Sequence, residues 1–217
     1  MNSYIKRAML FLQDIIFTVK CPYCEKVIDR NDYACKECKF PQKGYETYAV
    51  GGYKTISPFK YDGIFASGVK NFKFHENPSY ARQLAVPLVD EILAKYDIRT
   101  FDIITAVPMY YKNMRERGYN QSELLAKECA EIFNIPYAEL VEKHKKNKAQ
   151  HTLKGKERES NVQGVYRVID SQAVADKNIL IIDDIITTGN TLGECCKVLK
   201  KAGCKNICCA ALCAAIV

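Results

Sequence analysis

The chain has 217 residues, 48% of them hydrophobic and 26% charged, which is enough for one full core and at most a small appendage. Residues 143–158 account for +6 of the net charge of +7, so the basic character is local. This excludes a nucleic-acid-binding surface that extends over the whole protein. The basic segment suits an anionic partner, and it equally fits a solvated, mobile loop.

Residues 1–20 place apolar side chains at helical spacing and predict an amphipathic helix that packs on the body of the protein. Asp14 interrupts the apolar run, which is too short to span a bilayer and is not followed by a cleavage site. We therefore expect no transmembrane segment, with a role at a membrane surface as the alternative. The eleven cysteines and the lack of a secretory signal predict a cytoplasmic protein with reduced thiols.

Residues 21–42 contain two CxxC pairs separated by ten residues, formed by Cys21, Cys24, Cys35 and Cys38. Four thiolates in a tetrahedron suit zinc, and they leave no open coordination position for catalysis. This segment is therefore predicted to be a small ribbon with a structural zinc ion. The alternatives are four ordinary reduced cysteines or a single redox-active CxxC. The remaining cysteines have the pattern of small core residues.

Residues 43–217 are predicted to form a second domain, in which strands alternate with helices. Short strands are expected between residues 44 and 61, followed by a helix over 62–74. Ser79 and Tyr80 begin the next helix. One face of that helix is predicted to carry Leu84, Leu88, Ile92 and Leu93, and Pro87 is expected to kink it.

The second half of the chain continues this alternation. Strands are predicted at 101–108, 164–168, 179–182 and 207–217. A helix is expected around residues 124–133, and another over 191–202 with Gly203 as its C-cap. This order of elements predicts an α/β fold with a mostly parallel sheet covered by helices on both faces.

The stretch ILIIDDIITTGNT, residues 179–191, places Asp183 and Asp184 at the end of a buried strand. Two adjacent carboxylates there would repel each other unless they face water, a polyol or a metal-bound ligand. They could accept hydrogen bonds from the two hydroxyls of a ribose, with Mg²⁺ nearby.

The five residues that follow begin a helix, so their backbone N–H groups and hydroxyls suit a phosphate. They are Thr187, Thr188, Gly189, Asn190 and Thr191. Together with the acids they predict a site for a ribose 5-phosphate. The alternative is a helix capped by an aspartate after an ordinary turn.

These thirteen residues resemble the phosphoribosyl pyrophosphate signature of type I phosphoribosyltransferases. VPMYYKNMRERGYNQSELLA, from Val107, resembles a strand end followed by RxRGYNQ, and QHTLKGKERESNVQGVY, from Gln150, resembles a QxxLxxxERxxNVxGxF block. With the preceding CxxC pairs, the chain resembles the ComF family of competence-associated, amidophosphoribosyltransferase-like proteins over nearly its full length. The resemblance implies the type I phosphoribosyltransferase fold, with a parallel sheet flanked by helices and a small N-terminal zinc-ribbon-like segment.

The resemblance also implies roles for individual residues. Thr187 to Thr191 would hold the 5-phosphate, and Asp183 and Asp184 the ribose diol, directly or through Mg²⁺-bound water. Beyond the turn after Pro108, the pyrophosphate would be neutralised by Arg115 and Arg117, which otherwise form a solvated helix start. The basic segment fits a catalytic flap whose matching residues are Gln150 and Arg158. His144 and His151 are expected to be exposed rather than to act as general bases.

The expected function is that of a Mg²⁺-dependent phosphoribosyltransferase. It would bind phosphoribosyl pyrophosphate and transfer ribose 5-phosphate to an acceptor that the sequence does not name, in connection with DNA uptake. The alternative is a non-catalytic accessory factor that binds single-stranded DNA or competence proteins together with a phosphoribosyl ligand. A third reading is a catalytically dead scaffold.

Overall fold

The computed structural model describes residues 18–39, 45–49, 52–74, 78–145 and 164–215, without the side chains of 45–49 and 74. Most of the predicted N-terminal helix, as well as Gln150, His151 and Arg158, lies outside these ranges. The last residues of that helix, Thr18 to Lys20, are not helical, and Lys20 instead pairs with Val27 in an isolated bridge. In the described ranges, no helix combines the length and the apolar character needed to cross a membrane.

The core of the fold is a six-stranded sheet with the order β1-β2-β8-β7-β4 and with β3 also paired to β8. The pairs β2–β8, β3–β8, β8–β7 and β7–β4 are parallel, and only the edge pair β1–β2 is antiparallel. The strands are β1 (Tyr45–Ala49), β2 (Tyr53–Ser57), β3 (Phe59–Lys60), β4 (Ile103–Ala106), β7 (Asn178–Ile186) and β8 (Asn206–Ala214). The predicted mostly parallel sheet is confirmed.

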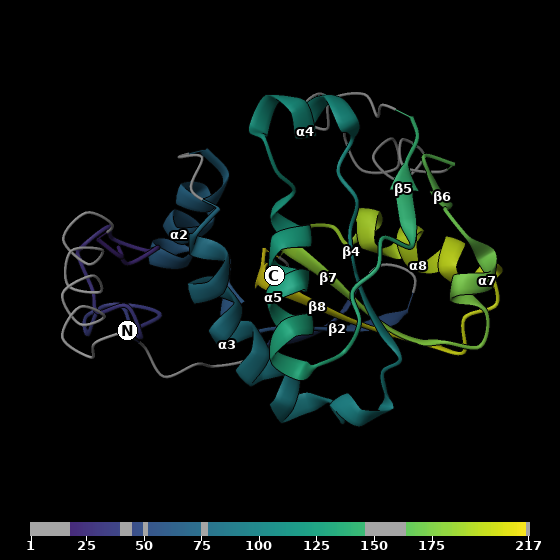
Figure 1. The fold of residues 1–217 in the computed structure, drawn as a ribbon, viewed down its shortest axis with the longest axis horizontal. Helices are drawn as coiled ribbons and strands as arrows, with labels where there is room; N and C mark the ends of the chain where they lie inside the picture. Colours follow the sequence, from purple (N-terminus) through teal and green to yellow (C-terminus); the bar gives the residue numbers. More distant parts are fainter. Residues whose placement is uncertain (1–17, 40–44, 50–51, 75–77, 146–163, 216–217) are drawn as a thin grey trace, which may run out of the picture.

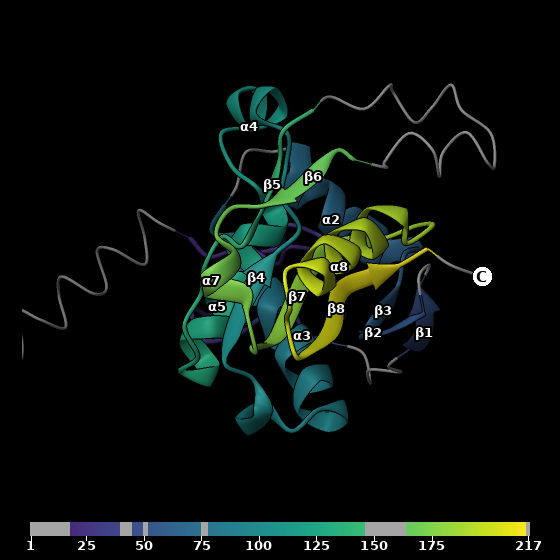
Figure 2. The same cartoon turned by 90° about the vertical axis from the view of Figure 1, so that its right-hand side faces the viewer.

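Helices cover both faces of this sheet (Figure 1 and Figure 2). One face carries α2 (Gly63–Phe74), α3 (Tyr80–Lys95) and α5 (Gln121–Phe133), and the other carries α8 (Asn190–Lys201). The central strand β7 is an almost continuous apolar run, as expected for a strand buried on both faces. Its alternate residues Leu180 and Ile182 pack toward α3 and α5, and Ile179 and Ile181 pack toward α8.

Smaller elements lie around the carboxyl ends of the parallel strands. The short helix α4 (Tyr111–Arg117) and an antiparallel pair, β5 (Val141–Lys143) with β6 (Tyr166–Val168), lie at the top of both views. The chain leaves β5 and returns to β6 around the predicted flap, most of which lies outside the described residues. A 3₁₀ turn, η1 (Ile98–Thr100), precedes β4, and α7 (Ser171–Val174) precedes β7.

Several predicted details are corrected by the structure. Leu84, Leu88 and Ile92 are fully buried, but Leu93 is 52% exposed, because a step of one residue turns it by about 100° away from the buried face of α3. The strand predicted at 101–108 is shorter, since only Ile103–Ala106 pair with β7. Gly203 has φ +89° but follows the C-cap, which is Ala202.

The four-cysteine segment packs against the outer side of α2. The ring of Tyr23 lies against Gly68, where an added Cβ would come within 2.6 Å of the ring. Asn71 donates a hydrogen bond from Nδ2 to the carbonyl of Pro22 at 2.9 Å, and Gln83 of α3 donates to the carbonyl of Lys20. Two helices of the larger body therefore hold this small segment in place.

Candidate functional site

The acidic pair lies where two neighbouring strands end at different levels. The last residue of β4, Ala106, pairs with Ile182, whereas β7 continues beside β8 to Ile186. Asp183 and Asp184 therefore lie within β7 and not after it, which corrects the predicted strand end at residue 182. Beyond the end of β4, other groups can therefore contact this edge of β7.

Asp183 is 8% exposed and is held by two short hydrogen bonds. Its Oδ1 accepts from the hydroxyl of Ser122, on the first turn of α5, and from the backbone N–H of Asp184, each at 2.9 Å. The same hydroxyl accepts from the Asp184 N–H at 3.2 Å. Burial first, and the charge of Asp184 second, raise the pKa of Asp183 to about 7.

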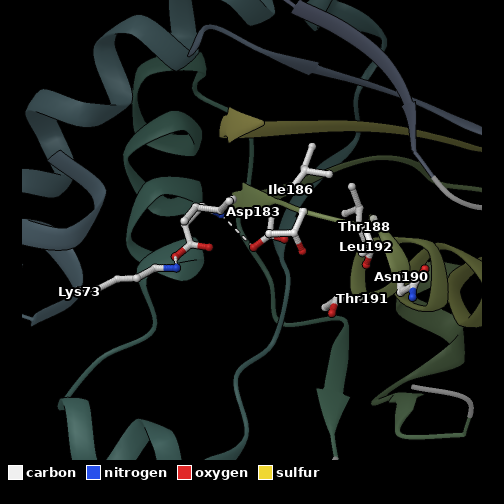
Figure 3. A pocket seen from close by; sticks show the side chains of 11 residues that line it. Lys73, Asp183, Ile186, Thr188, Asn190, Thr191 and Leu192 are labelled. Atoms are coloured by element: carbon white, nitrogen blue, oxygen red, sulfur yellow. Dashed lines mark hydrogen bonds and ion pairs between the residues drawn. The ribbon is translucent and has the colours of Figure 1, made fainter. Parts of the chain in front are cut away.

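Asp184 points to the opposite face of the sheet, as successive side chains of a strand do. Its carboxylate forms an ion pair with Lys73 of α2, with Nζ and Oδ2 2.7 Å apart. Both side chains are mostly shielded, with exposures of 19% for Lys73 and 13% for Asp184. Figure 3 shows Lys73 reaching across to the acidic pair from its own helix.

The residues after the acids complete a pocket of about 270 Å³, which is lined by Lys73 and by residues 183–192 (Figure 3). Gly189 has φ +72° and forms the N-cap of α8, a conformation that an L-residue rarely adopts. In the described part of the chain, the N–H groups of residues 187–189 have no hydrogen-bond acceptor. The predicted acids and threonine loop therefore line one pocket, and the amide N–H groups of this loop are donors of the kind that bind anions.

A second element approaches this pocket from the β5–β6 pair. Tyr166 of β6 is 4% exposed, and the side chain of Thr191 lies close enough to its phenol to favour the ionised form. Burial raises the pKa of Tyr166 well above its usual range. Lys143, on β5, lies over the Tyr166 ring at 5.5 Å, and burial lowers the pKa of its amine. His144 is exposed, as expected.

The two predicted pyrophosphate arginines lie on α4 and do not line the pocket. Arg115 is exposed, and Arg117 donates from Nη1 to Oε1 of Gln121 at 3.4 Å. Asn120 caps α5 by accepting from the Ser122 N–H, and its Nδ2 donates to the carbonyl of Val107. The RGYNQ stretch thus fastens α5 to the end of β4, while Arg115 and Arg117 stand outside the pocket.

Sequence reasoning missed Lys73 and the contact between Ser122 and Asp183. Ser122 lies on the first turn of α5 and donates a hydrogen bond from its hydroxyl to Asp183. No local signal marks Lys73, because it lies at the end of an ordinary amphipathic helix, far from the acids in the sequence. Only the packing of α2 on the sheet brings it to Asp184.

The four cysteines come together as predicted. Their sulfur atoms all lie within 4.8 Å of one another, and the Sγ atoms of Cys24 and Cys35 are 3.6 Å apart. Tetrahedral zinc with bonds of about 2.3 Å to sulfur requires sulfurs about 3.8 Å apart, so the cluster fits such an ion. The residue after each CxxC donates its N–H to the carbonyl of the first cysteine, which gives both pairs the same turn.

Comparison with known proteins agrees with this geometry. Residues 120–216 match the phosphoribosyl transferase domain family. Competence protein F of Haemophilus influenzae is 26% identical, over 86% of this chain and 81% of that protein. Competence protein ComFC of Streptococcus pneumoniae is 28% identical, over 86% and 77%. DNA utilization protein YhgH of Salmonella typhi is 24% identical, over 86% of each.

Among solved structures, the allosteric regulatory enzyme of purine biosynthesis has a TM-score of 0.41 and 20% identity, over 60% of this chain. This chain spans 25% of that enzyme's length. A purine phosphoribosyltransferase of Pyrococcus horikoshii has a TM-score of 0.38 and 17% identity, over 61% of this chain and 71% of that one.

The matched domain, the sheet and the loop after β7 define a type I phosphoribosyltransferase fold with an N-terminal four-cysteine cluster of the zinc-ribbon kind. Within that class, the chain is a distant homologue of competence protein F and of competence protein ComFC over most of its length.

Proposed function

We propose that this protein is a phosphoribosyltransferase that binds phosphoribosyl pyrophosphate in the pocket between β7 and α8. The observation that carries the proposal is that one pocket is lined both by two carboxylates and by a row of amide N–H groups that have no acceptor among the described residues. Ribose hydroxyls are donors and match the carboxylates, and a 5-phosphate is an acceptor and matches the amides. In this proposal residues 21–42 form the metal-binding segment and residues 43–217 the transferase domain.

The donor set of the pocket also fits Mg²⁺, which prefers oxygen ligands and keeps several of its waters. Asp183 and Asp184 would hold it, directly or through those waters, and when bound it supplies charge neutralisation for the pyrophosphate. Four cysteines with the observed spacing would hold a structural zinc ion. All eleven cysteines are free thiols in the structure, which supports a reducing, cytoplasmic location.

The reaction would break the bond from C1 of the ribose to the pyrophosphate oxygen and form a bond from C1 to an incoming nucleophile. This chain's residues contribute by fixing the sugar: the threonine loop holds the phosphate, and the carboxylates orient the hydroxyls next to C1. Arg115, Arg117, Gln150 and Arg158 are proposed to join the site on the pyrophosphate side. Closure of the segment that contains Gln150 and Arg158 would exclude water.

Calorimetric titration with phosphoribosyl pyrophosphate and Mg²⁺ tests this proposal. The variant Asp183→Asn with Asp184→Asn keeps the shape of the site, and we expect its affinity to be at least about tenfold weaker, or about 1.4 kcal/mol. Asp170→Asn, at the exposed N-cap of α7, is the matched control and should bind like the wild type. Equal affinities in the wild type and the double variant would refute the proposal.

A second candidate function, binding of single-stranded DNA, is favoured by the surface of α4. Tyr111 is 54% exposed and Met114 36%, and Lys112 and Arg115 are exposed beside them. The ring of Tyr110 lies 4.6 Å from that of Tyr111. Exposed aromatic rings among basic side chains are the pattern that binds single strands by stacking and by charge.

Fluorescence anisotropy with a labelled single-stranded oligonucleotide tests this second function. Tyr111→Ala and Arg115→Ala should each weaken binding, and Arg115→Ala should also reduce its dependence on salt. Lys177→Ala is the control, because Lys177 is exposed at the opposite end of β7. If the α4 variants bind as tightly as the control, α4 is not a DNA site.

A further inference from the structure

In the described part of the chain, the pocket proposed for the sugar phosphate is lined by one cationic side chain. Among the described residues that line it, Lys73 carries the only positive side chain, whereas Asp183 and Asp184 carry acids. A polyanionic ligand entering beside two carboxylates meets strong repulsion unless cations compensate for it. Arg115 and Arg117, which the sequence suggested for this purpose, lie on α4 outside the pocket.

The position of Lys73 depends on how α2 is held. Asn71, two residues before Lys73, donates its hydrogen bond to the carbonyl of Pro22, between the first two cysteines of the cluster. One turn earlier, Gly68 lies against the ring of Tyr23, which is in the same CxxC pair. From the stretch just before α5, the Tyr119 hydroxyl donates to the carbonyl of Phe72. The end of α2 is thus held by the cysteine segment and by the stretch that precedes α5.

We infer that Lys73 is a ligand-binding residue of the sugar-phosphate pocket, and that the four-cysteine segment, through Asn71, is what positions it. The inference rests on the proposed function and adds to it. In the absence of ligand, the Lys73 ammonium neutralises Asp184. With ligand bound, it supplies positive charge to the anionic oxygens above the acids. The cysteine segment acts on the pocket through α2. This helix contacts the segment at Asn71 and contributes Lys73 to the pocket lining.

The affinity of phosphoribosyl pyrophosphate with Mg²⁺, measured by calorimetry, tests both parts of the inference. K73M keeps the length and the helix propensity of the side chain but removes its charge. We expect about tenfold weaker binding, and a weaker dependence of affinity on salt. K70M is the matched control, since Lys70 is exposed on the same helix and does not line the pocket. Its affinity should stay within about twofold of the wild type.

The role of the cysteine segment is tested by a double-mutant cycle. N71A removes the hydrogen bond to Pro22 and leaves the pocket intact, and it should weaken binding about threefold to fivefold in the wild-type background. In the K73M background the same substitution should change affinity very little, because the side chain that it positions has lost its charge. Metal content and thermal stability of each variant show that the cysteine cluster remains intact.

The results distinguish a failure of the proposed function from a failure of this inference. A wild-type protein that does not bind phosphoribosyl pyrophosphate overturns the proposed function together with this inference. Wild-type binding that is lost in the double aspartate variant but unchanged in K73M overturns the inference alone. Equal losses from N71A in both backgrounds overturn the positioning role, since they show that Asn71 affects the pocket by a route that does not pass through Lys73.

Discussion

Substituting Gly68 tests how tightly the cysteine segment packs on α2. An alanine Cβ at this position would lie 2.6 Å from Cδ1 and 2.9 Å from Cε1 of Tyr23, well inside van der Waals contact. The ring cannot simply withdraw, because it packs edge-on against Phe59 and Phe65, with centroids 6.2 Å and 5.7 Å away. Overpacking of this kind costs about 1–3 kcal/mol, and replacing a helical glycine by alanine returns about 1 kcal/mol. We therefore expect Gly68→Ala to lower the free energy of unfolding by about 1 kcal/mol.

Urea denaturation measures this change, and a second background makes the test decisive. In a Tyr23→Leu protein the ring edge is absent, so the same Gly68→Ala change should raise stability by about 1 kcal/mol through helix propensity alone. Ser67→Ala, at the adjacent exposed position, controls for general effects on α2 and should stay within about 0.5 kcal/mol. A destabilisation of the same size in both backgrounds would show that the Tyr23 contact is not the cause.

Three further predictions follow from individual contacts. The buried hydroxyl of Tyr23 has no hydrogen-bond partner among the described residues, so Tyr23→Phe should raise the free energy of unfolding by about 1 kcal/mol in the same denaturation assay, and a loss would contradict this. Metal analysis should find one zinc per chain. Cys21→Ser should lose both the zinc and solubility, whereas Cys208→Ser, which lies outside the cluster, should retain the zinc. Freshly purified protein without metal would count against the site. Asn120→Ala loses both the helix cap and the hydrogen bond to Val107, and it should lower the free energy of unfolding by about 1–3 kcal/mol. Asn120→Asp keeps only the cap and should lower it by less. The reverse order would contradict this account.

The sequence predicted those parts of the fold whose signals are local. The apolar run of β7, the acids within it and the glycine at φ +72° are consecutive in the chain, so one stretch of residues specified a strand, a loop and a helix start. The two CxxC pairs likewise predicted the clustering of Cys21, Cys24, Cys35 and Cys38, because each pair brings its own turn.

Features that depend on distant packing could not be predicted in this way. Lys73 meets Asp184 only because α2 packs on the face of the sheet to which Asp184 points, and nothing near Lys73 in the sequence indicates this. The end of β7 was placed too early because carboxylates usually mark the end of a buried strand, whereas here β8 continues to pair with the strand as far as Ile186. Leu93 was wrongly assigned to the buried face because apolar character alone does not fix the angle of a residue on a helix.

Because β4 ends before β7, Asp183 also has a structural role that does not depend on a ligand. Where β4 stops, the N–H of Asp184 would face an empty neighbouring position, and the Asp183 carboxylate and the Ser122 hydroxyl take the place of the missing strand. Asp183→Ala would therefore destabilise the edge of β7 beyond the end of β4, as well as remove a charge. Asparagine keeps the acceptor oxygen, so it is the replacement that separates what this side chain does for the architecture from what it does for chemistry.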